Sequence, residues 1–353
     1  MTNLDDSSIY KTLDKSGMLD GIKGFPEQCR DAWQAVKGFN LPAGYKDINK
    51  VLVLGMGGSA IGADLVRSLV ETESPSPVLV HRDYSLPAYA DDKTLILVSS
   101  YSGNTEETLS GFDAALKLGS KKLALTTGGK LGERAKEAGV PVFTIGYKGQ
   151  PRAALGWSFI PSVGILGQVG LIGDKEKDVS ESIELLKEMV DELDETVPEA
   201  ENPAKQLARR LYGRLPVVYG TGITAEVAHR WKTQINENSK AWAFYEVLPE
   251  MNHNATVGFP YPQELAKQMH VVFLRSSLMN ERVKLRYEIT GELLDRANVP
   301  HEYLDSRGKS ALAQMLGLIS FGDFVSYYLA MLYNIDPSPV EVIDYLKSRL
   351  AEG

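Results

Sequence analysis

The sequence predicts an α/β protein with two domains, each built on a mainly parallel sheet flanked by helices in the doubly wound, flavodoxin-like manner. Short apolar runs alternate with helical patterns, which is typical of parallel strands joined by crossover helices. This alternation begins near residue 50 and restarts near residue 215, after a charged helical stretch. The length of 353 residues also exceeds that of an ordinary single domain and fits two.

The first half contains several short apolar runs that we interpret as strands. They lie at residues 50–55, 77–82, 94–100, 121–127 and 141–146. Helical patterns separate several of them, as in TEETLSGFDAALKLG. Residues 1–48 combine helix and loop patterns, including the amphipathic segment PEQCRDAWQAVKGF. We therefore expect a first domain at 49–173, with residues 1–48 as an extension that packs on it.

A charged segment at 174–211 separates the two halves. Its apolar residues have helical spacing, and Pro198 and Pro203 interrupt it, so we predict a solvated connecting helix that serves as a linker. Residues 212–353 are expected to form the second domain, with helices at its C-terminal end. Its strand patterns lie at 215–220, 268–277 and 301–306.

The restart has the form of an internal repeat. The segment VLGMGGSA aligns with VYGTGITA, so that Gly55 pairs with Gly220 and Gly57 with Gly222. A glycine after a strand is common in any α/β domain, but the alignment agrees with the repeated order of strands and helices. Two similar domains in tandem is therefore the architecture that we predict.

Charge and cysteine content exclude several classes of protein. The net charge of −8 disfavours nucleic acid or an anionic membrane surface as a partner. The single cysteine, Cys29, excludes a disulfide framework and favours a reducing cytoplasm. We interpret Cys29 as a small buried residue rather than a nucleophile. The N-terminal segment MTNLDDSSIYK lacks the basic and apolar regions of a secretory signal.

One uncharged stretch, residues 153–173, is long enough to span a bilayer. It contains Pro161 and Gln168, and four of its glycines recur at every third position, namely Gly164, Gly167, Gly170 and Gly173. On a helix, that spacing produces a ridge of small residues suited to close packing. We therefore predict a buried helix at a domain or subunit interface rather than a membrane span.

Two strand-to-helix loops carry the first chemical signal. In GMGGSAIG, the residues Gly57, Gly58 and Ser59 stand where backbone amides and a helix N-terminus favour an anion. In SSYSGNTEET, hydroxyl groups gather where the next helix begins. Hydroxyls and free amides together hold a phosphate dianion without a lysine or arginine. The residues expected to bind phosphate from this second loop are Ser100, Ser102 and Thr105.

Other interpretations of these loops stay open at this point. The first loop fits the dinucleotide pattern G-x-G-x-x-A through Gly55, Gly57 and Ala60, although Asp83 lies later than the acidic residue of that pattern. It could also be a tight turn without a ligand. The second loop could be no more than an elaborate helix cap at Thr105.

Taken together, the two loops resemble the signature of sugar isomerase (SIS) domains, in which they bind the phosphate of a phosphosugar. Two such domains in tandem resemble the phosphoglucose isomerase superfamily. Three further segments, PRAALGW, NENSKAW and EVLPEMNHNATVGF, are similar to the bifunctional phosphoglucose/phosphomannose isomerase family. The resemblance covers nearly the whole chain, and it is the combination of segments that makes it specific.

The resemblance implies an aldose–ketose isomerase that interconverts glucose 6-phosphate, and also mannose 6-phosphate, with fructose 6-phosphate. The reaction would move a proton between C2 and C1 through a cis-enediol, without a metal or other cofactor. The histidines are scattered, and neither His-x-His nor His-Glu-x-x-His occurs, so no metal site is predicted. The alternatives are a non-catalytic SIS protein or regulator that binds sugar phosphate and, more distantly, a nicotinamide-dependent oxidoreductase.

The resemblance also assigns the catalytic residues. Glu237 would be the base that shuttles the proton, and Arg152 would stabilise the enediolate. His253 would open the sugar ring and would reach the site from a neighbouring subunit, which implies a homodimer with shared active sites. Lys347 would lie near the ring oxygen. From the residues alone, a helix-end glutamate, a structural histidine and a solvated lysine remain alternatives.

Acceptance of the C2 epimer requires space around C2. In the family, a small polar residue shortly before the C-terminal lysine helps to create that space. Here the region reads DPSPVEVIDYLK, and both Ser338 and Val340 are candidates for the position.

Overall fold

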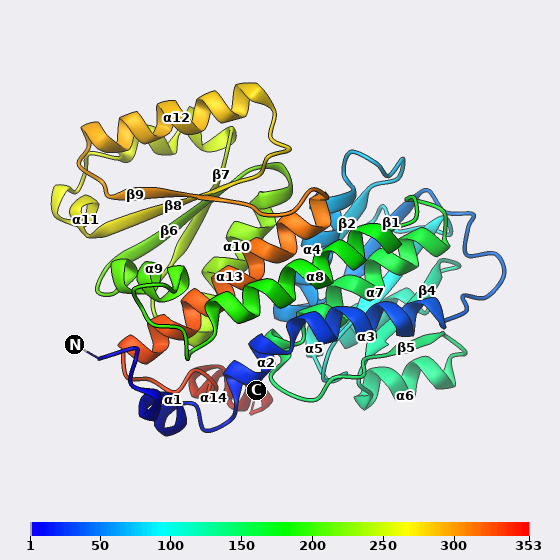
Figure 1. Ribbon diagram of the computed structural model, residues 1–353. Helices are drawn as coiled ribbons and strands as arrows, with labels where there is room; N and C mark the ends of the chain where they lie inside the picture. Colours follow the sequence, from blue (N-terminus) through cyan, green and yellow to red (C-terminus); the bar gives the residue numbers. More distant parts are fainter. Residues whose placement is uncertain (1, 353) are drawn as a thin grey trace.

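The computed structural model describes residues 2–352 and has two parallel sheets with a layer of long helices between and around them (Figure 1). The first sheet has the strand order β2-β1-β3-β4-β5, and the second has the order β7-β6-β8-β9. All neighbouring strands pair in parallel. The predicted fold class, with two doubly wound sheets and the flavodoxin-like order in the first, is confirmed.

The first sheet follows the sequence prediction strand by strand. Its strands are β1 (Lys50–Leu54), β2 (Val78–His81), β3 (Thr94–Ser99), β4 (Lys121–Thr126) and β5 (Val142–Thr144). Its helices are α4 (Gly57–Val70), α5 (Glu106–Ala115), α6 (Gly129–Glu137) and α7 (Leu155–Gln168). These strands could be predicted because helices cover both faces of the sheet, so that β3 is buried along its whole length and its sequence is a continuous apolar run.

The second sheet contains one strand that the apolar pattern does not predict. Its strands are β6 (Leu215–Gly220), β7 (Phe244–Val247), β8 (Met269–Arg275) and β9 (His301–Asp305). Its helices are α10 (Ala225–Asn238), α11 (Gln263–Gln268) and α12 (Glu281–Arg296). Strand β7 is a short edge strand whose residues alternate between exposed and partly buried, so it lacks the apolar run of its neighbours.

The N-terminal helices α1 (Ser7–Leu13), α2 (Met18–Lys23) and α3 (Phe25–Lys37) lead into the first sheet. Helix α3 packs on α7, which is buried as predicted for the uncharged stretch. However, α7 ends at Gln168, so Gly170 and Gly173 of the predicted glycine ridge lie beyond the helix and are exposed. The packing is close, because a Cβ atom added at Gly164 would lie 2.5 Å from Val36. Cys29 on α3 is fully buried, as expected.

The predicted linker is more deeply packed than the expected solvated helix. It forms α8 (Glu176–Leu193) and α9 (Pro203–Leu211), and both pack against α13 (Ala311–Leu332). The apolar face of α8 buries Leu186 and Leu193 completely or nearly so, because charged residues occupy only its outer face. This segment therefore belongs to the central helical layer.

Helix α13 is long and apolar enough to cross a membrane by length and composition, yet the whole of its apolar window is buried inside the protein. It is the central helix of the molecule in Figure 1. The last helix, α14 (Glu341–Ala351), differs from it sharply, since residues 341–350 are all exposed.

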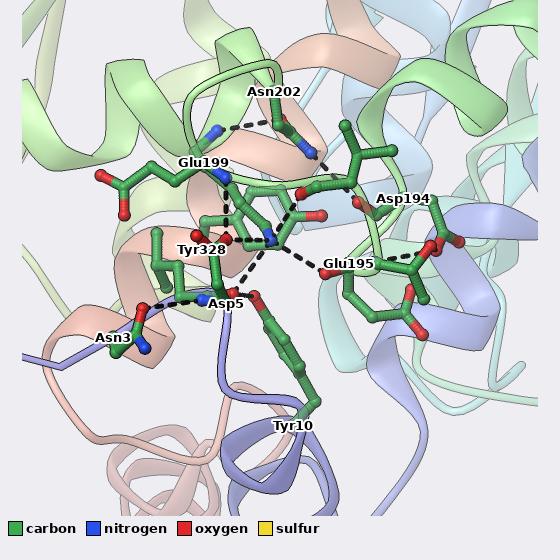
Figure 2. A network of polar contacts seen from close by, with 12 residues as sticks. Asn3, Asp5, Tyr10, Asp194, Glu195, Glu199, Asn202 and Tyr328 are labelled. Atoms are coloured by element: carbon green, nitrogen blue, oxygen red, sulfur yellow. Dashed lines mark hydrogen bonds and ion pairs between the residues drawn. The ribbon is translucent and has the colours of Figure 1, made fainter.

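A buried lysine ties the N-terminal segment to this helical layer (Figure 2). The ammonium group of Lys205 on α9 donates to the carbonyl oxygens of Leu4, Glu195 and Val197 at 2.8–2.9 Å. It also lies 3.2 Å from the Asp5 carboxylate. The side chain has no exposed surface, so these bonds replace its hydration and fix residues 4–5 against the loop before α9.

Candidate active site

The two predicted phosphate loops meet where the order of strands reverses. In a parallel sheet, ligands bind outside the carboxyl ends of the strands at such a switch point. The reversal lies between β1 and β3, which are neighbours in the sheet. The loops containing Ser59 and Ser100 follow these two strands, and the Tyr101 backbone amide donates to Ser59 Oγ at 3.2 Å. The structure therefore brings the two predicted loops together.

The first loop presents free backbone groups to open space. Gly57 has φ = +49°, and a Cβ atom added there would meet no described atom within 4 Å. Among residues 2–352, no side chain caps the N-terminus of α4. The Ser59 amide donates to the Met56 carbonyl oxygen at 3.1 Å, so the amides of Gly57 and Gly58 remain available to a ligand. At Gly58, an added Cβ would lie 3.3 Å from the Pro151 carbonyl oxygen, so this glycine permits the loop to approach the segment that carries Arg152.

In the second loop, the hydroxyl of the N-cap residue does not cap helix α5. Thr105 is the N-cap of α5, but its side chain makes no capping hydrogen bond within the described part of the chain. Instead, the hydroxyls of Ser100 and Thr105 lie 2.9 Å apart. Ser102 is exposed, and its Oγ accepts from the Asn104 amide at 3.2 Å. The interpretation as a cap alone therefore lacks support, and the loop retains hydroxyls and first-turn amides for an anion.

The second switch point lies between β6 and β8. It has a similar backbone turn, but its polar side chains are hydrogen-bonded within the protein. Gly222 has φ = +49°, the same value as Gly57. Here, however, Thr221 and Thr224 form a full capping box. Ser276 on the neighbouring loop donates to buried Gln314 at 2.6 Å. The repeat thus supplies two similar turns, which differ in that a capping box closes the 3-10 turn Gly222–Thr224 before α10, whereas α4 follows its glycine turn directly.

Arg152 is a fixed cation next to the first loop. It is 4% exposed, and its Nε donates to Asn238 Oδ1 at 2.7 Å. Its Nη2 donates to the carbonyl oxygens of Pro337 and Ser338 at 2.6 and 2.7 Å. Its Nη1 lies 3.8 Å from the Glu237 carboxylate. Burial lowers the pKa of Arg152 while Glu237 opposes that shift, and a guanidinium remains protonated in either case.

Glu237 lies in the last turn of α10, which continues to Asn238. Its side chain is 32% exposed. Neighbouring residues pin this helix end to α13, since Asn238 donates to Ser326 Oγ at 3.0 Å and Ser239 to the Ser326 carbonyl at 2.6 Å. The carboxylate is thus held toward Arg152 by a rigid support.

A cavity of about 780 Å³ opens beside Glu237 and is large enough for a sugar phosphate. Its lining includes Glu237, Lys240, Trp242, Phe244, Val340 and Ile343. Of the two candidates for the space around C2, Val340 lies in the cavity wall, whereas Ser338 is buried behind Arg152. Among residues 2–352, the Ser338 hydroxyl has no hydrogen-bond partner.

Two predicted catalytic residues are not joined to this group. His253 ends a short 3-10 turn at Glu250–His253 and is exposed. Lys347 is exposed on α14. In the part of the chain that the structure describes, no hydrogen bond or ion pair links either residue to Arg152 or Glu237. A single chain therefore assembles the phosphate loops, Arg152 and Glu237, while His253 and Lys347 remain on its surface.

The motif comparison overlooks Lys240, three residues after Glu237. Its ammonium donates to the carbonyl oxygens of Glu237 and Pro337 at 2.6 and 2.8 Å. Burial, followed by the charge of Arg152, lowers the pKa of Lys240 to about 8. Its position within the segment NENSKAW, beside Glu237, could have indicated Lys240 as a site residue. For Arg230, whose guanidinium holds the Arg152 carbonyl at 2.8 Å, the sequence carries no comparable signal.

The structure argues against the dinucleotide interpretation, and within residues 2–352 it offers one group of potential metal ligands. The order of the first sheet is flavodoxin-like rather than that of a dinucleotide-binding sheet. Ligand atoms of Asp64, Glu226 and His229 lie within 4.8 Å of one another. Each carboxylate is already paired, Asp64 with Arg82 and Glu226 with Arg67. The two cations balance the two anions, so this group is an ion-pair network that joins α4 to α10.

Comparison with known proteins first defines the class. Residues 200–350 match the family described as the bacterial phospho-glucose isomerase C-terminal SIS domain. A hypothetical protein from Thermus thermophilus shares the fold with a TM-score of 0.73 and 16% identity, covering 98% of this chain and 93% of that one. A glucose-6-phosphate isomerase like protein from the same organism has a TM-score of 0.64 and 19% identity, with 99% of both chains covered. The fold is therefore that of SIS-domain phosphosugar isomerases.

Sequence relatives then define the family. The chain is 44% identical to a bifunctional phosphoglucose/phosphomannose isomerase of Caldicellulosiruptor bescii, over 95% of this chain and 99% of the relative. It is 38% identical to the protein of the same name from Aquifex aeolicus, over 91% and 98%. The chain belongs to the bifunctional phosphoglucose/phosphomannose isomerase family. A more distant relative, 28% identical over 87% of this chain and 90% of its own length, is a D-glucosamine-6-phosphate 4-epimerase of Sulfolobus acidocaldarius.

Proposed function

We propose that this aldose–ketose isomerase interconverts glucose 6-phosphate and mannose 6-phosphate with fructose 6-phosphate through a cis-enediol. The observation that carries the proposal is the approach of the Glu237 carboxylate to Arg152 Nη1, at 3.8 Å, beside an uncapped helix terminus lined with hydroxyls. This arrangement combines a base, a fixed cation and an anion site, which are the parts that enediol chemistry on a phosphosugar requires.

The proposed reaction begins with the phosphate held at the first switch point by Gly57, Gly58, Ser59 and the hydroxyls of the second loop. Binding the non-reacting end orients C1 and C2. Glu237 then removes the proton from one carbon and returns it to the other. Arg152, held by Asn238 and the Pro337 carbonyl, keeps its Nη1 available to the enediolate oxygen. Glucose and mannose 6-phosphates differ only at C2 and give the same enediol, so one base serves both.

The site is proposed to be complete only in a homodimer. His253 is exposed, and Val257 and Tyr261, which follow it closely in the chain, are 83% and 76% exposed. Trp242, beside the cavity, is 75% exposed. Exposed apolar side chains of this size favour contact with another protein surface. We propose that a second copy that covers them brings His253 of one subunit to the Glu237 cavity of the other. The proposed location is a reducing cytoplasm, which the single cysteine favours.

The first prediction tests the reaction. Purified protein is incubated with fructose 6-phosphate and a metal chelator, and formation of glucose and mannose 6-phosphates is followed. We expect both products, and we expect Glu237→Gln to lower kcat by about a thousandfold, because the amide cannot accept the proton. Sugar-phosphate binding without turnover would favour the regulator, and change at C4 of an amino sugar phosphate would favour an epimerase. Full activity of Glu237→Gln would remove Glu237 as the base.

A further inference from the structure

Lys240 occupies a backbone position that ordinarily belongs to glycine. It follows Ser239, the C-cap of α10, and has φ = +53°. Helices commonly end in this left-handed conformation, but the residue there is usually glycine or asparagine, because a larger side chain is disfavoured by contact with the backbone. A lysine at this position is an outlier, and an observed outlier of this kind points to a role for the side chain.

The side chain joins two segments that are distant in sequence. Although the residue as a whole is exposed, its ammonium turns back onto the protein and donates to the Glu237 carbonyl at 2.6 Å and to the Pro337 carbonyl at 2.8 Å. The first carbonyl belongs to the last turn of α10. The second belongs to residues 336–340, which connect α13 to α14 and which we call the strap.

Two cations, Arg152 and Lys240, therefore hold the strap through the same atom, the Pro337 carbonyl oxygen. Arg152 Nη2 donates to the same Pro337 carbonyl at 2.6 Å and also to the Ser338 carbonyl at 2.7 Å. The strap forms part of the wall of the Glu237 cavity through Asp336 and Val340. Loss of the Lys240 bond would thus change the position of the cavity wall and of Arg152 relative to Glu237.

We infer that Lys240 is a positioning residue, which clamps the strap to the end of α10 and so fixes the cavity wall and Arg152 relative to the Glu237 carboxylate. The inference rests on the proposed isomerase function for its effect on the rate. The contact of Lys240 with the strap does not depend on which sugar phosphate reacts.

The clamp makes the site sensitive to alkaline pH. The charged groups that face the Lys240 ammonium are Arg152 next to α7, Glu237 on α10 and Asp336 in the strap. Burial and Arg152 together bring the pKa of Lys240 to about 8, below its ordinary value, so the positive charge is present at neutral pH and is lost as the pH rises through about 8. A neutral amine binds carbonyl oxygens more weakly than an ammonium.

The test compares Lys240→Gly with Lys240→Arg. Glycine suits the left-handed backbone, so we expect Lys240→Gly to remain folded with an unchanged or higher thermal midpoint, and yet to lose about ten- to a hundredfold in kcat. Arginine keeps a permanent charge, so Lys240→Arg should recover part of kcat and remove the loss of rate near pH 8. The matched control is Asn298→Gly, at another left-handed residue (φ = +55°) after α12, and it should leave kcat unchanged.

A second readout separates this inference from the proposed function. Hydrogen exchange of the strap amides and of α14 should be faster in Lys240→Gly than in the unaltered protein, with no change elsewhere. If the unaltered protein has no isomerase activity, the proposed function fails, and the exchange experiment alone decides the clamp. If the protein is an active isomerase, either an unchanged kcat or an unchanged strap exchange in Lys240→Gly overturns the inference.

Discussion

Gly57 and Gly222 occupy matching positions in two strand-to-helix turns and share φ = +49°. At both positions, a Cβ atom would meet no described atom within 4 Å, so an alanine would be strained only by its backbone conformation. The two residues differ in what surrounds them, since α4 lacks a side-chain cap in the described chain whereas Thr221 and Thr224 close the second turn. They therefore form a matched pair for separating stability from binding.

We expect Gly57→Ala and Gly222→Ala to lower the free energy of unfolding by similar amounts, about 1–2 kcal/mol each. Only Gly57→Ala should raise KM for sugar phosphate, because its methyl group enters the space beside the phosphate loops. Urea unfolding and steady-state kinetics of both variants check this. An equal rise of KM in both would mean that the first switch point is not the phosphate site.

At the scale of elements, one carboxylate joins three segments of the second half. Glu302 on β9 accepts from Arg210 on α9 at 2.6 and 2.9 Å and is 2.7 Å from His270 Nε2 on β8. Burial opposes ionisation, but the His270 hydrogen bond and Arg210 outweigh it and bring the pKa of Glu302 to about 2. Because this pKa lies below that of the unfolded chain, ionised Glu302 stabilises the fold above about pH 4.5, and that contribution is lost as the pH falls toward 2.

Replacement of this carboxylate should therefore have a pH-dependent cost. We expect Glu302→Gln to lower the free energy of unfolding by about 2 kcal/mol at neutral pH, with partial exposure reducing the full linkage value. The difference from the unaltered protein should shrink in acid, between about pH 4.5 and 2, where Glu302 loses its charge. Urea unfolding at a series of pH values measures it, and a difference that is constant with pH would contradict the assigned shift.

Among the strands, those that are buried on both faces could be predicted from the sequence, and the exposed edge strand could not. Strands β1 and β3 are covered on both faces, so each contains an uninterrupted run of four apolar residues, VLVL and LILV, and both could be found directly. Strand β7 lies at a sheet edge and owes its conformation to pairing with β6, which no local pattern reveals. The two predicted phosphate loops could likewise be found from the sequence, because each is one contiguous segment. The hydrogen bonds from Arg152 to the carbonyl oxygens of Pro337 and Ser338 join segments that are distant in sequence. Any residue has a backbone carbonyl, so the sequence does not reveal these bonds.

At the scale of the whole molecule, the two halves share one interior. A single cluster of buried apolar residues extends from α3 and α7 through α8 to α10 and α13. The proposed active-site residues follow the same path, with the predicted phosphate loops on the first sheet and Glu237 on a helix of the second half. His253 and Lys347 lie outside this path, on the surface. The proposed homodimer accounts for the place of His253, since a second copy would supply this proposed ring-opening group.

The proposed homodimer leads to a prediction by complementation. Glu237→Gln and His253→Gln should each be nearly inactive. A heterodimer purified after co-expression of the two variants would contain one site with both substitutions and one with neither, so it should recover about half of the activity of the unaltered dimer. Homodimers of each variant are the controls. If both residues act within one chain, the heterodimer stays as inactive as its parents.

The burial of Cys29 has a practical consequence for spectroscopy. Its thiol has no exposed surface, and burial raises its pKa, whereas thiol-reactive dyes attack the exposed thiolate. The native chain is therefore silent toward such reagents. A cysteine introduced at exposed Ser348 on α14 would be the sole labelling site. A fluorophore or spin label there would report the position of α14 as substrate enters, in an otherwise unaltered protein.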